Sequence, residues 1–213
     1  MEAWAIVVAA GSGARFGRPK QYAELAGRRL VEWAVDGARA TCQGVVLVAR
    51  RDDVASLTVV GADAVVAGGD TRSASVRAGL AAIPSQADVI VVHDAARPLA
   101  SAELWGAVLA AVAAGADAAV PAIPVTDTIK RVEDHTVIET LDRRQLVAVQ
   151  TPQAFRANAL RAAHANATDA TDDAAVVEAA GGRVVTVAGE RRNLKITELA
   201  DLGVAALLLE GRT

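Results

Sequence analysis

A glycine-rich stretch near the start of the chain combines small residues with two cations. Residues 9–20 read AAGSGARFGRPK and directly follow an apolar run. Small residues and glycine after a strand let backbone N–H groups come close to a ligand, and this geometry suits a polyphosphate. Arg15 and Lys20 would add positive charge to such a cradle. The stretch also fits a helix N-terminus with solvated Arg and Lys side chains, so by itself it only favours a phosphate site.

Two common nucleotide-binding motifs are excluded in this stretch. A Walker loop needs Gly-Lys-Ser/Thr, which is absent at the required spacing. A dinucleotide fingerprint needs a third glycine where Phe16 stands, and an acidic residue after the second strand, where the chain has Arg50 and Arg51. The stretch therefore predicts phosphate binding of another type.

Two further segments place polar residues just after apolar runs. In VHDAARP, Asp94 is positioned to meet a hydrated divalent cation or a ribose hydroxyl, although it could equally cap a helix or turn. His93 could act as a base, but a histidine at a strand end is more often structural. In GGDTRSAS, residues 68–75, a glycine turn opens a helix whose N-terminus and hydroxyls could face a nucleotide or merely cap the helix.

The elements that must position these residues follow from the apolar pattern. Short runs rich in Val and Ile occupy residues 5–9, 45–49, 64–67, 89–93, 118–121 and 184–187. Stretches with helical spacing lie between most of them, at 30–40, 73–82 and 102–114. This alternation predicts a doubly wound, mostly parallel α/β sheet covered by helices on both faces. In such sheets ligands bind beyond the carboxyl ends of the strands, where the residues above would lie.

One segment departs from this alternation. Residues 128–149 read as two alternating arms about a polar turn at Glu133, Asp134 and His135, which predicts an inserted β-hairpin. A hairpin is marginally stable alone, so we expect it to pack on another surface. Because the chain shows no linker or repeat, we expect residues 1–213 to form a single domain.

The composition narrows the classes of partner. The 213 residues include 22 Lys and Arg against 25 Asp and Glu, a net charge of −3, and 53% hydrophobic residues, which excludes intrinsic disorder. Without a basic block, we expect no binding to nucleic acid or to an anionic membrane. Residues 4–10 lack the basic flank of a signal peptide, and residues 104–125 are Ala-rich and broken by prolines, so we expect no membrane segment. The lone Cys42 indicates a reducing, cytoplasmic setting.

Taken together, the motifs resemble the 2-C-methyl-D-erythritol 4-phosphate cytidylyltransferase family of the non-mevalonate isoprenoid pathway. The resemblance implies the Rossmann-like nucleotidyltransferase form of the α/β fold. The matching stretches run in the family's order across nearly the full chain, at residues 9–22, 68–80, 92–98, 127–131, 141–155, 171–181 and 193–202. Each is weak alone, and the combination is highly specific. The segment between Arg15 and Lys20 is short for the family, which affects the reach of this loop over a triphosphate.

The resemblance implies that the phosphate of methylerythritol 4-phosphate attacks the α-phosphorus of CTP, with Mg²⁺ as cofactor and pyrophosphate as leaving group. It implies that Arg15, Lys20 and Lys195 are catalytic. The residues it places at the nucleotide are Ala9, Ala10, Gly11, Ser12, Gly13, Gly69, Arg72, Ser75, Asp94 and Ala95, with Asp94 also at the metal. The residues it places at the second substrate are Thr128, Arg143 and Thr151, together with Lys195.

The resemblance further implies a homodimer in which the hairpin carries Arg143 into the neighbour's site. Without the family match, each cation at the second substrate would be read as a solvated surface charge. Other readings stay open from the residues alone. They are a ribitol 5-phosphate cytidylyltransferase, a sugar-1-phosphate nucleotidyltransferase that uses another base, a non-catalytic nucleotide-binding subunit and, more remotely, a dinucleotide-dependent oxidoreductase.

Overall fold

The computed structural model describes residues 1–13, 16–17, 19–166, 170 and 172–211. Its centre is an eight-stranded sheet with the order β10-β7-β11-β6-β1-β4-β5, in which β12 also pairs with β7. The bounds are β1 Ala3–Val8, β4 Gly44–Ala49, β5 Ala64–Ala67, β6 Val89–Asp94, β7 Ala118–Pro124, β10 Val147–Val149, β11 Gln153–Arg156 and β12 Val184–Ala188. All six predicted apolar runs are strands of this sheet.

The sheet is mostly parallel, as predicted. Strand β1 pairs in parallel with β4 and β6, β4 with β5, and β7 with β12. Two strands of the sheet run antiparallel to their neighbours, and their place in the sheet was not predicted. Strand β11 pairs with both β6 and β7, and β10, which falls within the predicted hairpin range, pairs with β7. Strand β11 joins the parallel strands on its two sides into one sheet.

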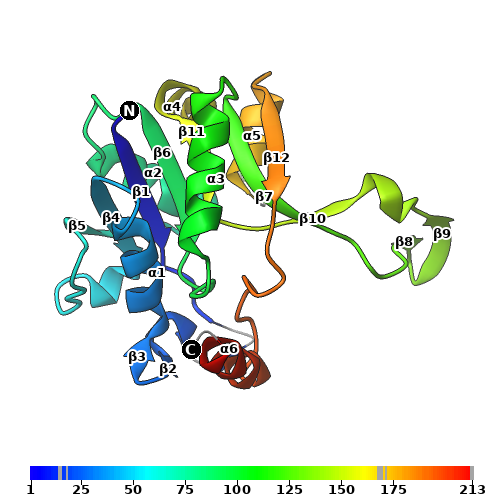
Figure 1. Ribbon diagram of the computed structural model, residues 1–213, viewed down its shortest axis with the longest axis horizontal. Coiled ribbons are helices and arrows are strands. Elements are labelled where there is room, and N and C mark those ends of the chain that lie inside the picture. Colours follow the sequence, from blue (N-terminus) through cyan, green and yellow to red (C-terminus); the bar gives the residue numbers. More distant parts are fainter. Residues whose placement is uncertain (14–15, 18, 167–169, 171, 212–213) are drawn as a thin grey trace.

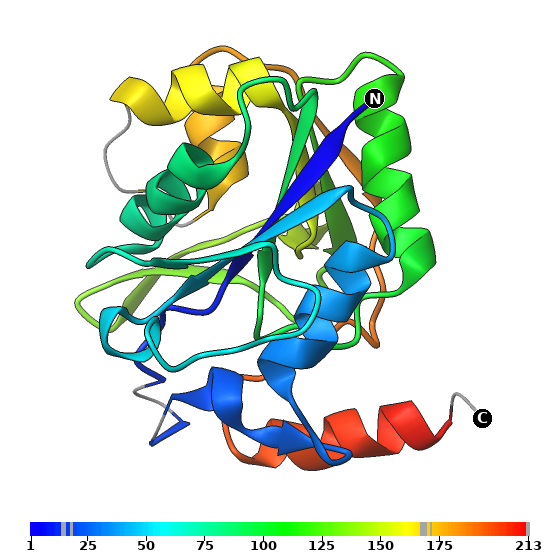
Figure 2. The same ribbon diagram turned by 90° about the vertical axis from the view of Figure 1, so that its left-hand side faces the viewer.

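Helices cover both faces of the sheet (Figures 1 and 2). Helices α1 (Leu30–Arg39) and α3 (Ala102–Ala113) pack on one face; α2 (Arg72–Ala82), α4 (Ala157–Asn166) and α5 (Asp173–Ala179) pack on the other. Successive side chains of a strand point to opposite faces, so Ala5 and Val7 of β1 pack with α1 and α3 whereas Ile6 packs with α2. The doubly wound architecture is therefore confirmed.

A third apolar cluster lies beyond the carboxyl ends of β1 and β6. The C-terminal helix α6 (Ala200–Glu210) packs there beside the short strands β2 (Glu24–Leu25) and β3 (Arg28–Arg29) (Figure 2). The buried side chains of Phe16, Leu30 and Ile196 join these elements. This layer brings a late segment of the chain next to the 3₁₀ turn η2 (Lys20–Tyr22).

The predicted hairpin projects from the body as an arm (Figure 1). Strands β8 (Lys130–Glu133) and β9 (Thr136–Thr140) form it, and Asp134 and His135 turn with positive φ angles of 42° and 65°. The hairpin is shorter than the predicted 128–149, because the 3₁₀ turn η4 (Arg143–Gln145) follows it and β10 returns to the central sheet. In the described part of the chain, no helix is both long and apolar enough to cross a membrane.

Candidate active site

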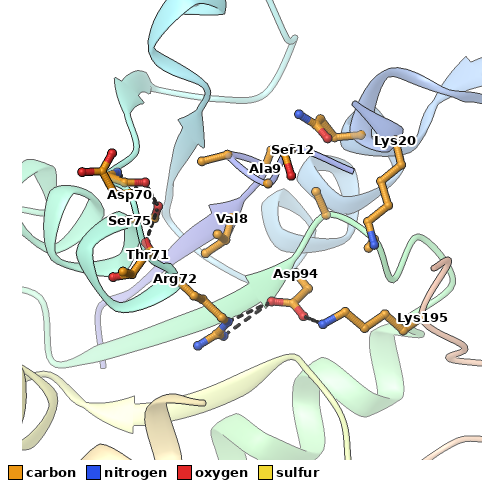
Figure 3. Close-up of a pocket in the computed structure, with 16 residues that line it drawn as sticks. Val8, Ala9, Ser12, Lys20, Asp70, Thr71, Arg72, Ser75, Asp94 and Lys195 are labelled. Carbon is orange, nitrogen blue, oxygen red and sulfur yellow. Dashed lines mark hydrogen bonds and ion pairs between the residues drawn. The ribbon is translucent and has the colours of Figure 1, made fainter. Parts of the chain in front are cut away.

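A cleft of about 540 Å³ opens at the carboxyl ends of β1 and β6 (Figure 3). Two glycine turns, the start of α2 and the segment before α6 surround it. The lining residues are Val8, Ala9, Ala10, Gly11, Ser12, Lys20, Gln21, Gly69, Asp70, Thr71, Arg72, Ser75, Asp94, Ala95, Ala96 and Lys195. The sequence placed phosphate and nucleotide chemistry at this edge of the sheet, and the structure has a cleft there.

The first glycine turn is anchored at both ends. Strand β1 ends at Val8, and the Ala9 N–H still donates to the Val48 carbonyl at 2.8 Å, so the turn starts from a fixed position. Gly13 has a φ of +68°, and its carbonyl accepts the Phe16 N–H at 2.8 Å. Phe16, which occupies the place of a third glycine, is 8% exposed and packs into the third apolar cluster. The third glycine of a dinucleotide-binding loop allows a helix to pack closely on the strand, whereas here the buried Phe16 side chain fixes the end of the turn.

The second glycine turn packs directly against the first. A Cβ atom at Gly68 would lie 2.4 Å from the Ala10 Cβ, and one at Gly69 would lie 2.5 Å from the Ala74 Cβ. No side chain fits at either position. Thr71 caps α2 by accepting the Ala74 N–H, and the Ser75 hydroxyl accepts the Gly69 N–H at 3.2 Å. The glycines are thus required for close packing, which leaves the start of α2 facing the cleft.

Asp94 is the electrostatic centre of the cleft (Figure 3). Its Oδ2 accepts a hydrogen bond from Lys195 Nζ at 2.6 Å, and its Oδ1 lies 3.4 Å from both Nε and Nη2 of Arg72. Burial acts to raise the pKa of the Asp94 carboxyl, but Arg72 and Lys195 outweigh it and hold the pKa far below its ordinary value. Asp94 is therefore a carboxylate at any physiological pH. It caps no helix, so this alternative is not realised.

His93 and Asp94 have opposite surroundings because successive residues of a strand point to opposite faces. The His93 ring turns toward α3, where its centroid lies 4.9 Å from that of Trp105. His93 Nε2 lies 3.1 Å from the Arg97 carbonyl, so this nitrogen carries the proton and Nδ1 accepts from the Thr151 hydroxyl at 3.1 Å. Burial lowers the pKa of His93 to about 4. The structural interpretation of His93 fits these contacts.

Thr151 lies below the cleft. Its Oγ1 accepts the Asp94 N–H at 3.0 Å while its proton serves His93, so both functions of the hydroxyl are used inside the protein. The residue is 5% exposed and does not line the cleft. In this chain Thr151 fixes the backbone of Asp94, and its predicted contact with a second substrate stays a prediction.

Both cleft lysines depend on one late segment. Lys20 Nζ donates to the Ile196 carbonyl at 2.8 Å, and Lys195 is the residue immediately before it. The segment is fixed by Asn193, which is fully buried and donates to the Thr151 carbonyl at 2.9 Å. The Arg97 guanidinium donates to the Asn193 carbonyl at 2.8 Å. Two cations far apart in the sequence thereby reach one edge of the cleft.

Apart from Thr151, the predicted site residues differ in their relation to the cleft. Those that line the cleft are Ala9, Ala10, Gly11, Ser12, Lys20, Gly69, Arg72, Ser75, Asp94, Ala95 and Lys195. Gly13 flanks the cleft without lining it, and Arg15 lies outside the described residues. Thr128 and Arg143 are exposed at the base of the arm and do not line the cleft of their own chain.

Five lining residues were not predicted, namely Val8, Gln21, Asp70, Thr71 and Ala96. Each lies within or beside one of the motifs, so proximity in sequence was the available signal. Gln21 is 3% exposed, and a buried glutamine beside a glycine turn has no periodic signature.

The carboxylates in the cleft fit only one mode of metal binding. No group of three His, Cys, Asp or Glu residues in the described part of the chain could hold an ion. The lining includes two carboxylates, the partly buried Asp94 and the exposed Asp70. Mg²⁺ is commonly held by one or two carboxylates, with substrate phosphates and water completing its octahedron. The donor set fits an ion that arrives with a nucleotide, and it does not fit a closed metal site.

Comparison with known proteins agrees with this geometry. The family model described as 2-C-methyl-D-erythritol 4-phosphate cytidylyltransferase, IspD, matches residues 3–211. A protein of that name from Rubrobacter xylanophilus is 42% identical, with 98% of this chain and 95% of the relative covered. A crystal structure of the enzyme of that name from Thermus thermophilus superposes with a TM-score of 0.83 at 34% identity, covering 96% of this chain and 98% of that one.

Some relatives are longer. A protein named bifunctional enzyme IspD/IspF from Solidesulfovibrio magneticus is 42% identical over 97% of this chain, which spans 57% of that relative's length. The chain therefore matches about half of such bifunctional relatives and nearly all of the single-function ones. On the family match and the relatives that it covers almost completely, the chain belongs to the 2-C-methyl-D-erythritol 4-phosphate cytidylyltransferase family.

Proposed function

We propose that this protein transfers the cytidylyl group of CTP to 2-C-methyl-D-erythritol 4-phosphate, giving 4-diphosphocytidyl-2-C-methyl-D-erythritol and pyrophosphate. The observation that carries the proposal is the meeting of Lys20, Lys195 and Arg72 at a cleft walled by two glycine turns. A triphosphate needs such converging cations together with close backbone donors. Family membership supplies the identity of the base and of the acceptor.

The chemistry requires charge stabilisation more than proton transfer. An oxygen of the acceptor phosphate forms a bond to the α-phosphorus, the bond from that phosphorus to the bridging oxygen breaks, and pyrophosphate leaves with the electron pair. The acceptor phosphate has a second pKa near 6 and is mostly a dianion at pH 7, so no general base is needed. His93 is accordingly buried in a structural role. Mutual repulsion of the anions is the obstacle that Lys20, Lys195 and Arg15 would reduce.

Mg²⁺, when bound, would neutralise charge on the nucleotide phosphates, and Asp94 is the residue that would hold it. Lys195 and Arg72 orient that carboxylate. The glycine turn at residues 11–13 would offer backbone N–H groups to the phosphates. The wall made by Ala9, Ala10 and Gly69 is small enough for a base or ribose to approach the backbone.

The proposal includes a homodimer with shared sites. Thr128 and Arg143 lie at the base of an arm that points away from the body, so within one chain they do not reach the cleft (Figure 1). The arm exposes Val132, Val137 and Ile138 by 48% to 56%. A second copy would cover these side chains and receive Arg143 in its own cleft, where a guanidinium could bind a phosphomonoester.

The proposed setting is a reducing cytoplasm. Cys42 is a free, buried thiol, and burial raises its pKa to about 11. Such a thiol is protonated and shielded, which suits a compartment where disulfides do not form.

One matrix of assays tests the function. Purified protein with Mg²⁺ is offered CTP, UTP or ATP together with methylerythritol 4-phosphate or ribitol 5-phosphate, and pyrophosphate release is measured. We expect release only with CTP and methylerythritol 4-phosphate. Release with ribitol 5-phosphate instead would reassign the acceptor, and nucleotide binding without release in any well would indicate a non-catalytic subunit.

A further inference from the structure

A line of alternating charges leads from the cleft into the body of the protein. Lys195 pairs with Asp94 at 2.6 Å, and Arg72 bridges Asp94 at 3.4 Å and Asp173 at 2.6 Å. Asp173 Oδ1 then accepts a hydrogen bond from His164 Nε2 at 3.0 Å. Asp94 and Arg72 line the cleft, whereas the Asp173 side chain is 1% exposed and has no contact with it.

The bridge made by Arg72 is asymmetric. Its Nη1 reaches a single oxygen of Asp173 at the distance of a strong charge-assisted hydrogen bond. Its Nε and Nη2 both point at one oxygen of Asp94, but at the outer limit of a hydrogen bond. The guanidinium is therefore held by the buried carboxylate and only loosely by the one in the cleft.

Asp173 does not cap the helix that carries it. It is the first residue of α5, but the N-cap is Asp172, whose side chain accepts the Ala175 N–H at 2.9 Å. Burying a carboxylate costs several kcal/mol unless partners compensate, and the two oxygens of Asp173 contact Arg72 and His164. The position of this carboxylate is therefore explained by Arg72 and His164, and by no capping role.

We propose that Asp173 is a positioning residue for nucleotide binding, because its hold on Arg72 keeps the guanidinium from closing on Asp94. Asp94 then has one firm partner, Lys195, and one weakly held oxygen that can engage the incoming nucleotide with its cation. The inference rests on the proposed function for the identity of that nucleotide. It adds a requirement for a side chain that never touches the ligand.

Removing the charge of Asp173 changes this balance in a defined direction. The Arg72 guanidinium is only 23% exposed, so after Asp173→Asn it has Asp94 as its one remaining anion among the partners described above. A buried cation moves toward the available carboxylate. The second oxygen of Asp94 becomes a tight ion-pair partner and must be freed before the nucleotide binds.

The test is a calorimetric titration of CTP with Mg²⁺ into folded protein, without the second substrate. We expect the dissociation constant to rise about tenfold for Asp173→Asn, the loss of roughly one charge-assisted contact. His164→Gln is the matched control, because a glutamine amide can still donate to Asp173, and we expect its affinity to match the wild type. Loss of packing alone would affect both variants and would lower the folded fraction without changing the dissociation constant.

A double-variant comparison separates positioning from a general effect. In an Arg72→Gln background no guanidinium can close on Asp94, so Asp173→Asn should change the affinity no further. Comparison of the double variant with Arg72→Gln alone remains possible if Asp173→Asn alone fails to fold, because the double variant has no unpaired buried guanidinium. A folded Asp173→Asn protein that binds like the wild type, or an equal loss in the Arg72→Gln background, would overturn the inference. Failure of the proposed function looks different: the wild type would bind the nucleotide and release no pyrophosphate.

Discussion

The cleft and the arm of this protein differ in how their side chains are supported. Around the cleft, charged side chains from separate segments of the chain hold one another, as the partly buried Asp94 does with Lys195 and Arg72. On the arm every residue of β8 and β9 is exposed, and its ion pair of Arg131 with Glu139 at 2.9 Å stays within the hairpin. Contacts within the chain preorganise the cleft, whereas the side chains of β8 and β9 stay exposed in the described part of the chain.

The difference predicts where substitutions act. Exposed ion pairs contribute about 0 to 1 kcal/mol, and two strands alone are marginally stable, so the arm adds little to the stability of the body. In the cleft, the charged side chains position one another, so removal of one side chain also displaces the side chains that contact it. Four predictions follow this contrast from its largest expected effect to its smallest.

The largest effect is expected at Lys20. Lys20→Ala removes a preorganised cation from the cleft, and loss of one such donor typically lowers turnover by about 10² to 10³, or roughly 3 to 4 kcal/mol. Steady-state pyrophosphate release measures the loss. Arg77→Ala, an exposed cation of α2 outside the cleft, is the control and should keep full activity. Near-wild-type turnover of Lys20→Ala would remove Lys20 from the mechanism.

Next comes the dependence of stability on pH that His93 creates. The unfolded chain gains a proton near pH 6.5, whereas folded His93 gains it only near pH 4. Because the unfolded state binds more protons in this window, the free energy of unfolding decreases as the pH falls from 6.5 to 4, by up to about 3 kcal/mol. Urea titrations at several pH values check this against His93→Gln. A variant with the same pH slope as the wild type would show that another group is responsible.

A smaller effect separates the arm from the cleft directly. Arg143→Glu leaves the body intact, because Arg143 is exposed and donates a hydrogen bond to the nearby Thr126 carbonyl. Activity should still fall at least about tenfold, as a phosphate loses a charge-assisted contact and meets a like charge. The protein should unfold at the wild-type denaturant concentration.

Mixing Arg143→Glu with Lys20→Ala sharpens this prediction. In a hybrid dimer one cleft carries both defects, while the other has its own Lys20 and receives Arg143 from its neighbour. Activity should therefore recover in part after subunit exchange. Absence of recovery, with exchange verified by tagged subunits, would count against shared sites.

The smallest effect on stability is expected at the arm's apolar surface. Val137→Glu changes a side chain that is 55% exposed and lies opposite Val132, so the free energy of unfolding of the monomer should change by less than about 0.5 kcal/mol. Sedimentation velocity should nonetheless show a shift from dimer to monomer. Glu139→Gln, a polar exchange on the same strand, is the control. A dimer that withstands Val137→Glu would place the interface elsewhere.

The fold was predictable where its signal is local. Continuous apolar runs identified six strands, and helical spacing identified α1, α2 and α3, because burial on both faces of a sheet leaves a simple periodic trace. Strand β11 was missed because its four residues begin with Gln153 and end with Arg156, so it forms no apolar run. Helices α4, α5 and α6 were missed as well; α5 and the first residues of α6 belong to motifs, whereas α4 lies in none of them.

The sequence predicted most of the residues at the site but not the contacts between them. Asp94 and the glycine turns stand out because they follow apolar runs directly. The pairing of Arg72 with Asp173 spans 101 positions, and that of Asp94 with Thr151 spans 57, so no spacing rule could reveal either. These contacts decide which side chains serve the ligand and which serve their neighbours.

The hydrogen bond from Lys20 to the Ile196 carbonyl joins positions 176 residues apart. A growing polypeptide would thus complete both glycine turns long before Lys20 acquired this hydrogen bond. Fragments released early, or trimmed by a protease ahead of residue 195, would lack both this anchor and the neighbouring Lys195. The position of Lys20 in the cleft therefore depends on synthesis of the chain through residue 196.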